Sequence, residues 1–366
     1  MELPPQNIDN PGLVRPQVVP EYAYPAMQRH RPSFLARFLF GLFVLAFLGS
    51  LALNFLLGAT AVVGGLGSSD SEVRIQEKFF SHDRSAQDKV AILSIEGTIL
   101  SGEGFFKSQV DRALQDAKDG HLKAIVVRVN SPGGTITGSD YMLHHLKQLV
   151  KEAKIPVVVS MGGMAASGGY YVSMCAGDAA DVIFAEPTTW TGSIGVIIPH
   201  YNVADLMKNW GIEEDNVASH RLKGMGSIAR KMTEEERNIF QALVDDGFSR
   251  FKTVIREGRP KFQKDPEALD KLATGQVYAA DQALEIGLVD KIGFIEDAID
   301  RAIELAKLDK EKVKVVKYKS EPRLSDMLFG SEARLRRTDL SALLDLATPQ
   351  AYYLCTWLPS AISARQ

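Results

Sequence analysis

A serine set among glycines directly follows a short apolar run in the middle of this chain. Residues 155–160 (IPVVVS) predict a buried strand, and residues 161–171 (MGGMAASGGYY) predict a sharp turn at Ser167 followed by a helix. The small neighbours of Ser167 let another backbone approach closely, and the Gly168 N–H points to where an oxyanion would form. The segment fits a serine nucleophile or a tight packing turn.

Strand and helix patterns alternate around this turn. This succession predicts an α/β layered fold with a largely parallel sheet. The expected strands are 90–95, 124–129, 156–160 and 181–185, and the expected helices are 108–117, 140–152, 233–257, 266–272 and 295–306.

The N-terminal part differs from the rest in composition. Residues 1–37 are proline-rich without an apolar period, which predicts a disordered tail. Residues 38–67 contain no charged side chain and are long enough to span a bilayer, so we expect a retained transmembrane anchor. The alternative, a cleaved signal peptide, fits less well because the preceding tail and the apolar run are both too long.

The charges that flank residues 38–67 predict the orientation of the anchor. Arg29, Arg31 and Arg37 lie just before it, and Asp70 and Glu72 come first after it. The positive-inside rule then places the N-terminus in the cytoplasm and the larger part of the chain outside the cytoplasm of a bacterial cell.

The remaining chain divides into three expected parts. Residues 68–88 are a polar linker, residues 89–310 form the α/β domain, and residues 311–366 are a C-terminal segment. The apolar stretch 351–358 is too short to span a membrane, so we expect it to dock against the core or against a neighbouring subunit.

Composition excludes several classes of function. The net charge of −3 gives no electrostatic reason to expect nucleic-acid binding. The seven histidines show no zinc-binding spacing, so a metalloenzyme is not expected. The two cysteines, Cys175 and Cys355, suit packing positions, although a bridge between them stays open.

Two more turns of small residues follow predicted strands, at the sheet edge where open α/β folds bind ligands. Residues 130–134 (NSPGG) have glycine N–H groups suited to an oxyanion hole, and residues 191–195 (TGSIG) carry the hydroxyl of Ser193. A serine nucleophile also needs a base. His200 lies near one of these turns, and Lys223 stands among small and apolar residues that would desolvate it and lower its pKa.

Several ordered motifs between residues 90 and 306 resemble the signal peptide peptidase A family of membrane-anchored bacterial serine proteases, in its short, single-repeat form. They are 90–99 (VAILSIEGTI), 128–134 (RVNSPGG), 160–171 (SMGGMAASGGYY), 191–196 (TGSIGV), 275–278 (GQVY) and 287–290 (GLVD).

The resemblance implies a role for each candidate residue. Ser167 would be the nucleophile and Lys223 the general base, with Ser193 hydrogen-bonded to the lysine. Gly133 and Gly168 would supply the N–H groups of the oxyanion hole. Acyl transfer of this kind requires no metal or cofactor.

The resemblance also implies a fold, an assembly and a substrate. Members share the fold of Clp protease and crotonases and form homo-oligomeric, dome-shaped rings in which neighbouring subunits contribute the serine and the lysine. Their substrates are short apolar peptides, the signal peptides that remain in the membrane after cleavage. Three alternatives are a Clp-like Ser/His peptidase, a crotonase-type acyl-CoA enzyme and a catalytically silent membrane scaffold.

Overall fold

The computed structural model describes residues 34–66, 75–321 and 351–354, and the chain divides into two compact units at residue 71. The first unit contains helix α1 (Phe34–Leu66). Across these described ranges, no helix meets the combined length and apolarity that a membrane crossing requires. The anchor expected at 38–67 therefore stays a prediction.

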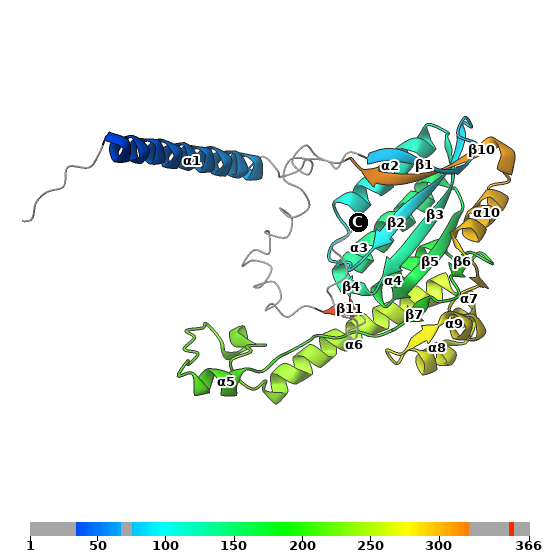
Figure 1. Cartoon of the computed structure of the whole chain (residues 1–366). Helices are drawn as coiled ribbons and strands as arrows, with labels where there is room; N and C mark the ends of the chain where they lie inside the picture. Colours follow the sequence, from blue (N-terminus) through cyan, green and yellow to red (C-terminus); the bar gives the residue numbers. More distant parts are fainter. Residues whose placement is uncertain (1–33, 67–74, 322–350, 355–366) are drawn as a thin grey trace, which may run out of the picture. The chain divides into compact units, whose positions relative to one another are not determined.

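The second unit is built on a mixed sheet that is largely parallel (Figure 1). Its main order is β1-β10-β2-β3-β5-β6-β9, and only the β1–β10 pair along it is antiparallel. The bounds are β1 (Ile75–His82), β2 (Asp88–Glu96), β3 (Leu122–Ser131), β5 (Val157–Ala166), β6 (Ile183–Ala185), β9 (Lys291–Ile292) and β10 (Val313–Ser320).

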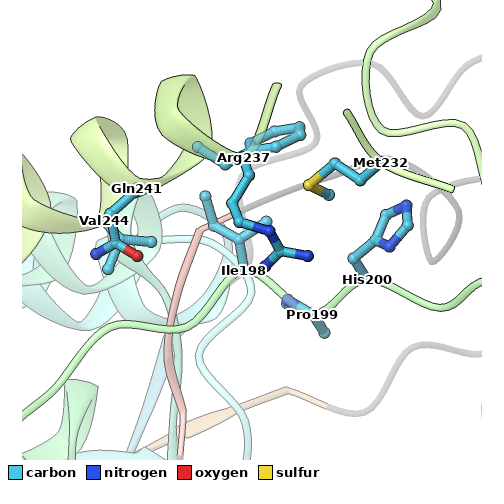
Figure 2. Close-up of a pocket in the computed structure, with 8 residues that line it drawn as sticks. Ile198, Pro199, His200, Met232, Arg237, Gln241 and Val244 are labelled. Atoms are coloured by element: carbon cyan, nitrogen blue, oxygen red, sulfur yellow. The ribbon is translucent and has the colours of Figure 1, made fainter. Parts of the chain in front are cut away.

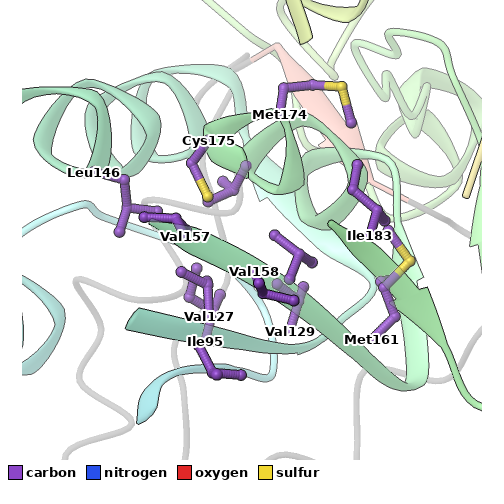
Figure 3. Close-up of a cluster of buried hydrophobic side chains, with 14 of the residues drawn as sticks. Ile95, Val127, Val129, Leu146, Val157, Val158, Met161, Met174, Cys175 and Ile183 are labelled. Carbon is purple, nitrogen blue, oxygen red and sulfur yellow. The ribbon is translucent and has the colours of Figure 1, made fainter. Parts of the chain in front are cut away.

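Helices pack on both faces of this sheet. Helices α2 (Phe105–Lys118), α3 (Ile136–Ala153) and α4 (Gly168–Ser173) lie on one face, and α10 (Ile295–Leu305) lies on the other (Figure 1). The core between them is made of aliphatic side chains from the central strands, such as Val127 and Val158, with Leu146 of α3 packed over them (Figure 3). The expected α/β fold with a largely parallel sheet is confirmed.

A long helix, α6 (Glu234–Gly258), extends from the sheet towards α5 (Ala204–Asn209) at its far end (Figure 1). Between α5 and α6 lies η2 (Arg221–Gly224), a short 3₁₀ helix. We call residues 198–233 the arm. The remaining helices of the described residues are α7 (Pro260–Lys264), α8 (Pro266–Leu272) and α9 (Ala280–Ile286) and the 3₁₀ helices η1 (Met174–Ala176) and η3 (Lys310–Lys312).

Seven of the described strands were not expected from the sequence. The linker predicted at 68–88 contains β1, and the C-terminal segment predicted at 311–366 contains β10, which lies between β1 and β2. Every second residue of β1 is exposed, so it lacks the apolar run that marks the central strands. The other five are the two-residue strand β9 and the three-residue strands β4 (Gly133–Thr135), β7 (Trp190–Gly192), β8 (Val277–Ala279) and β11 (Tyr352–Leu354).

Candidate active site

Ser167 lies at the junction between β5 and α4, as the sequence predicted. Its backbone has φ 53° and ψ −115°, a conformation that L-residues rarely adopt and that costs about 1–3 kcal/mol. Two hydrogen bonds hold it there. The Ser167 N–H donates to the Gly192 carbonyl at 2.7 Å, and the Ser167 carbonyl accepts from the Tyr171 N–H at 2.8 Å. The turn is therefore fixed from both sides in a strained geometry.

The hydroxyl of Ser167 is buried without a hydrogen-bond partner. The residue is 1% exposed, and its Oγ contacts no donor or acceptor within the part of the chain that the structure describes. Leaving a buried hydroxyl unpaired costs about 1–3 kcal/mol. A serine whose only role is to pack a turn gains nothing from an unpaired hydroxyl. A nucleophile, in contrast, needs a hydroxyl that no other group occupies.

Gly133 and Gly168 pack against each other beside Ser167. A Cβ on Gly133 would lie 2.6 Å from the Gly168 nitrogen and 3.1 Å from the Ser167 Cβ, and a Cβ on Gly168 would lie 2.4 Å from the Ser139 Oγ. Gly133 also has φ 97°. Both positions therefore require glycine, and their backbones line the space next to the serine. The Gly133 N–H donates to the Ser131 Oγ at 3.1 Å.

Ser193 belongs to a turn that is joined to Ser167 through the neighbouring Gly192. Strand β7 pairs with β5 so that Gly192 lies beside Ala166. Ser193 itself is 7% exposed with φ 50°, and its N–H donates to the Gln276 carbonyl at 2.7 Å. The three small-residue turns therefore meet at one edge of the sheet, as their positions after strands predicted.

Neither of the two candidate bases is paired with the Ser167 hydroxyl within one chain. Lys223 lies on η2 in the arm, and its side chain is exposed to solvent. The prediction that small and apolar neighbours would shield this lysine from water is therefore wrong for the isolated chain. The His200 Nε2 lies 3.3 Å from the Ser227 carbonyl oxygen. Since the Ser167 Oγ has no partner among the described residues, neither side chain is hydrogen-bonded to it.

A cluster of buried aromatic side chains lies next to Ser167, and the sequence did not predict it. Tyr171 of α4 and Phe251 of α6 pack edge to face with ring centroids 5.2 Å apart. Burial raises the pKa of the Tyr171 hydroxyl, which donates to Asp140 Oδ1 at 2.6 Å. Arg250 binds the same carboxylate at 2.8 Å and 2.9 Å. Apolar patterning alone counts such aromatic residues as core, so only the fold brings them to the site.

A cavity of about 300 Å³ lies further along α6, between this helix and the beginning of the arm. Figure 2 shows the Arg237 side chain reaching from α6 towards Ile198 and Pro199. The lining residues are Ile198, Pro199, His200, Met232, Arg237, Phe240, Gln241 and Val244.

The expectation that the two cysteines occupy packing positions can be tested at Cys175. Cys175 is a free, buried thiol, and burial raises its pKa to about 12. It packs in the core beneath α3 (Figure 3), as expected for a packing cysteine. Cys355 lies outside the described residues.

A strained, buried serine at the end of a parallel strand, beside two glycines that no other residue can replace, defines an α/β serine hydrolase. The sequence profile of Peptidase family S49 matches residues 150–309. The chain is 35% identical over 252 residues to "Putative protease slr0021" of Synechocystis sp., covering 69% of this chain and 87% of that protein. The chain belongs to Peptidase family S49, and it is a serine peptidase.

Two further relatives differ in length. "Protease 4" of Salmonella typhi is 36% identical over 250 residues, which cover 66% of this chain and 38% of that protein. "Putative signal peptide peptidase SppA" of Enterococcus faecium is 36% identical over 246 residues, which cover 65% of this chain and 69% of that protein. The chain therefore spans well under half of the Salmonella protein but most of the other two.

Proposed function

We propose that this chain is a membrane-anchored serine endopeptidase in which Ser167 and Lys223 form the catalytic dyad. The observation that carries the proposal is the buried, unpaired hydroxyl of Ser167 beside the Gly133 and Gly168 backbones. Nothing else in the described chain combines an unpartnered nucleophile, a strained turn and a cradle of obligatory glycines.

The reaction is acyl transfer to serine. Neutral Lys223 accepts the Ser167 proton while Oγ adds to the peptide carbonyl carbon. The Gly168 N–H stabilises the oxyanion together with the Gly133 N–H, which exchanges its bond to the Ser131 Oγ for one to the oxyanion. The helix that begins at Gly168 adds to the positive potential there. The lysine then protonates the leaving amine, and water hydrolyses the acyl-enzyme.

A neighbouring copy of the chain supplies Lys223 in this proposal. The lysine is exposed and makes no contact with the Ser167 hydroxyl of its own chain. The arm that carries it also exposes large apolar side chains, among them Tyr201, Trp210 and Val217. Association of copies through the arm would bury both, and desolvation of the lysine would favour its neutral form.

The substrates are apolar peptides at the outer face of a bacterial plasma membrane, such as signal peptide remnants. The support is the uncharged run 38–67, the arginines before it and the likeness to the Enterococcus protein named as a signal peptide peptidase. An anchored enzyme whose nucleophile is buried among glycines suits short extended peptides better than folded proteins.

The test compares purified full-length Ser167→Ala, Lys223→Ala and wild-type protein in hydrolysis of an apolar signal-like peptide. We expect both variants to lose at least about 10²-fold in kcat. Lys231→Ala is the matched control, because this lysine lies eight residues further on, before α6. A fully active Lys223→Ala would refute the dyad, and a fully active Ser167→Ala would refute the serine mechanism.

Co-expression then tests assembly. Ser167→Ala and Lys223→Ala chains carrying different tags are purified as mixed oligomers. Sites that combine the intact serine of one chain with the intact lysine of another should recover a substantial fraction of activity. Mixed oligomers as inactive as either variant would show that both residues act within one chain.

A further inference from the structure

The two N–H groups of the proposed oxyanion hole come from different elements. Gly133 belongs to β4, which continues directly into α3, and Gly168 is the first residue of α4. The Thr135 Oγ1 caps α3 by accepting the Gly138 N–H at 3.0 Å, so the end of β4 and the start of α3 form one unit. The oxyanion hole therefore keeps its shape only if α3 and α4 stay fixed relative to each other.

The beginnings of α3 and α4 touch at Gly168. A Cβ on Gly168 would lie 2.4 Å from the Ser139 Oγ, which itself donates to the Thr135 carbonyl at 2.9 Å. A shift of α4 in one direction therefore meets Ser139, and a shift in the other direction moves the Gly168 N–H away from the oxyanion. Misplacement of a catalytic group by about 1 Å costs about 10²-fold in rate.

A side-chain hydrogen bond joins the two helices one residue further along α3. The Tyr171 hydroxyl of α4 donates to Asp140 Oδ1 at 2.6 Å, and the Tyr171 N–H donates to the Ser167 carbonyl at 2.8 Å. Tyr171 is fully buried, and burial raises the pKa of its hydroxyl, so the hydroxyl remains a donor. Tyr171 thus binds the nucleophile turn with its main chain and α3 with its side chain.

Helix α6 holds the same carboxylate from another side. The Arg250 Nη2 donates to the two Asp140 oxygens at 2.8 Å and 2.9 Å, and its Nε donates to Oδ1 at 3.2 Å. The side chain of Arg250 is 57% exposed and that of Asp140 is 36% exposed, so this ion pair adds little to the stability of the fold. Its effect is geometric, because the guanidinium fixes both oxygens in one orientation and keeps Oδ1 towards Tyr171.

We infer that Asp140 is a positioning residue: its carboxylate, bound by Tyr171 and Arg250, fixes α4 against α3 and α6 and keeps the Gly168 N–H aligned with that of Gly133. This inference rests on the proposed function. Asp140 acts on the nucleophile turn through Tyr171. Because α6 follows the arm directly, the same carboxylate also connects the oxyanion hole to the helix next to the proposed lysine.

Steady-state kinetics of full-length variants test the inference. Asp140→Ala removes the acceptor of the Tyr171 hydroxyl and should lower kcat about 10- to 10²-fold, with KM changed less than about twofold. Asp140→Asn keeps an oxygen for Tyr171 and should recover most of this loss. Tyr171→Phe keeps the buried ring and removes only the bond to Asp140, so it should lower kcat about tenfold even if Asp140→Ala does not fold.

Glu257→Gln is the matched control. Glu257 pairs with Lys147 at 2.8 Å, and this ion pair joins the same two helices, α3 and α6, seven residues further along each of them. Both of its side chains are about as exposed as those of Asp140 and Arg250. The control should therefore keep the wild-type kcat, because the pair lies about two helical turns beyond the contact with α4.

A peptide aldehyde separates positioning from a general loss of structure. Its adduct with Ser167 places an oxyanion in the hole, so its inhibition constant should rise by the factor by which kcat falls, while KM stays constant. The double variant Asp140→Ala with Tyr171→Phe should lose no more than Asp140→Ala alone, since both changes break one link.

Two results would overturn the inference and leave the proposed function standing. One is a folded Asp140→Ala or Tyr171→Phe protein with the kcat of wild type, and the other is a loss of kcat in Glu257→Gln equal to that in Asp140→Ala. Wild-type protein that hydrolyses no apolar peptide would overturn the proposed function itself.

Discussion

The N–H of Ser167 donates to the carbonyl of Gly192 at 2.7 Å, and this bond joins the nucleophile turn to the turn that carries Ser193. Gly192 has φ 84°, and a Cβ there would lie 2.6 Å from the Tyr278 ring. The position of the serine backbone thus depends on a second glycine turn and, through it, on β8. The strain at Ser167 is held by this contact and not by the local sequence alone.

Ser167→Ala should abolish peptide hydrolysis without destabilising the fold. The change removes a buried hydroxyl that has no partner within the described chain, so the free energy of unfolding should rise by about 1 kcal/mol. Urea unfolding of the two proteins measures this difference. A decrease of more than about 2 kcal/mol would mean that the hydroxyl stabilises the fold and is not an unpaired nucleophile.

Gly133→Ala should reduce both activity and stability. The new methyl group would meet backbone atoms of Gly168 and Tyr353, which cannot move aside without displacing the turn at Ser167. Gly163→Ala is the control in the neighbouring strand end, because its methyl would lie 3.8 Å from the Asn130 Oδ1 and meet no closer atom. Equal kinetics and equal unfolding curves for the two variants would contradict the proposed cradle.

Glu236→Gln should lower stability at neutral pH and remove part of its dependence on acid. Arg230 and the Thr233 N–H bind the Glu236 carboxylate, and the hydrogen bond from Arg230 is the main reason that its pKa falls from the ordinary 4.5 to about 2. The charged form is favoured in the folded state. Its stabilisation is therefore fully present above pH 4.5 and disappears as the pH falls towards 2.

The measurement for Glu236 is the difference in unfolding free energy between wild type and variant, taken at several pH values. We expect about 1–2 kcal/mol at pH 6 and a decreasing difference below pH 4.5. Glu235→Gln is the control, since Glu235 pairs with Arg221 where both side chains are exposed and screened by water. A difference that does not change with pH would show that Arg230 does not favour the charged form of Glu236.

Phe251→Ala should affect both the stability of the fold and the aromatic cluster next to Ser167. Phe251 is fully buried between Tyr171 and Tyr353, so its loss should cost about 3–5 kcal/mol. Phe251→Leu keeps most of the buried volume and should cost much less, while it removes the aromatic ring beside Tyr171. Thermal unfolding and kcat for hydrolysis of an apolar signal-like peptide distinguish the two effects.

The sequence predicted the elements whose side chains are buried in a regular pattern. The continuous apolar run of β2 and the apolar period of α3 were sufficient, because central parallel strands and amphipathic helices carry strong signals. β10 mixes valine with lysine (VKVVKYKS) without a strict alternation or a continuous apolar run, so the sequence did not predict its position in the sheet. Three-residue strands such as β4 are too short to show any period.

The sequence predicted only those parts of the site that depend on residues adjacent to one another in the chain. Glycines on both sides of Ser167 predicted its turn, since few other residues permit a close backbone approach. The exposure of Lys223 depends on the arm, which is a tertiary feature. The contact of Tyr353 with Tyr171 joins residues far apart in sequence, and an apolar tail alone cannot reveal its partner.

The place of β10 between β1 and β2 has a consequence for synthesis of the protein. β1 and β2 are separated by the five residues 83–87 and leave the ribosome together, whereas the strand that belongs between them follows more than two hundred residues later. A hairpin of β1 with β2 is the nearest pairing available in the meantime, and it must open before β10 can enter. We therefore expect the nascent chain to hold a premature hairpin, which makes the completion of this sheet a late and slow event.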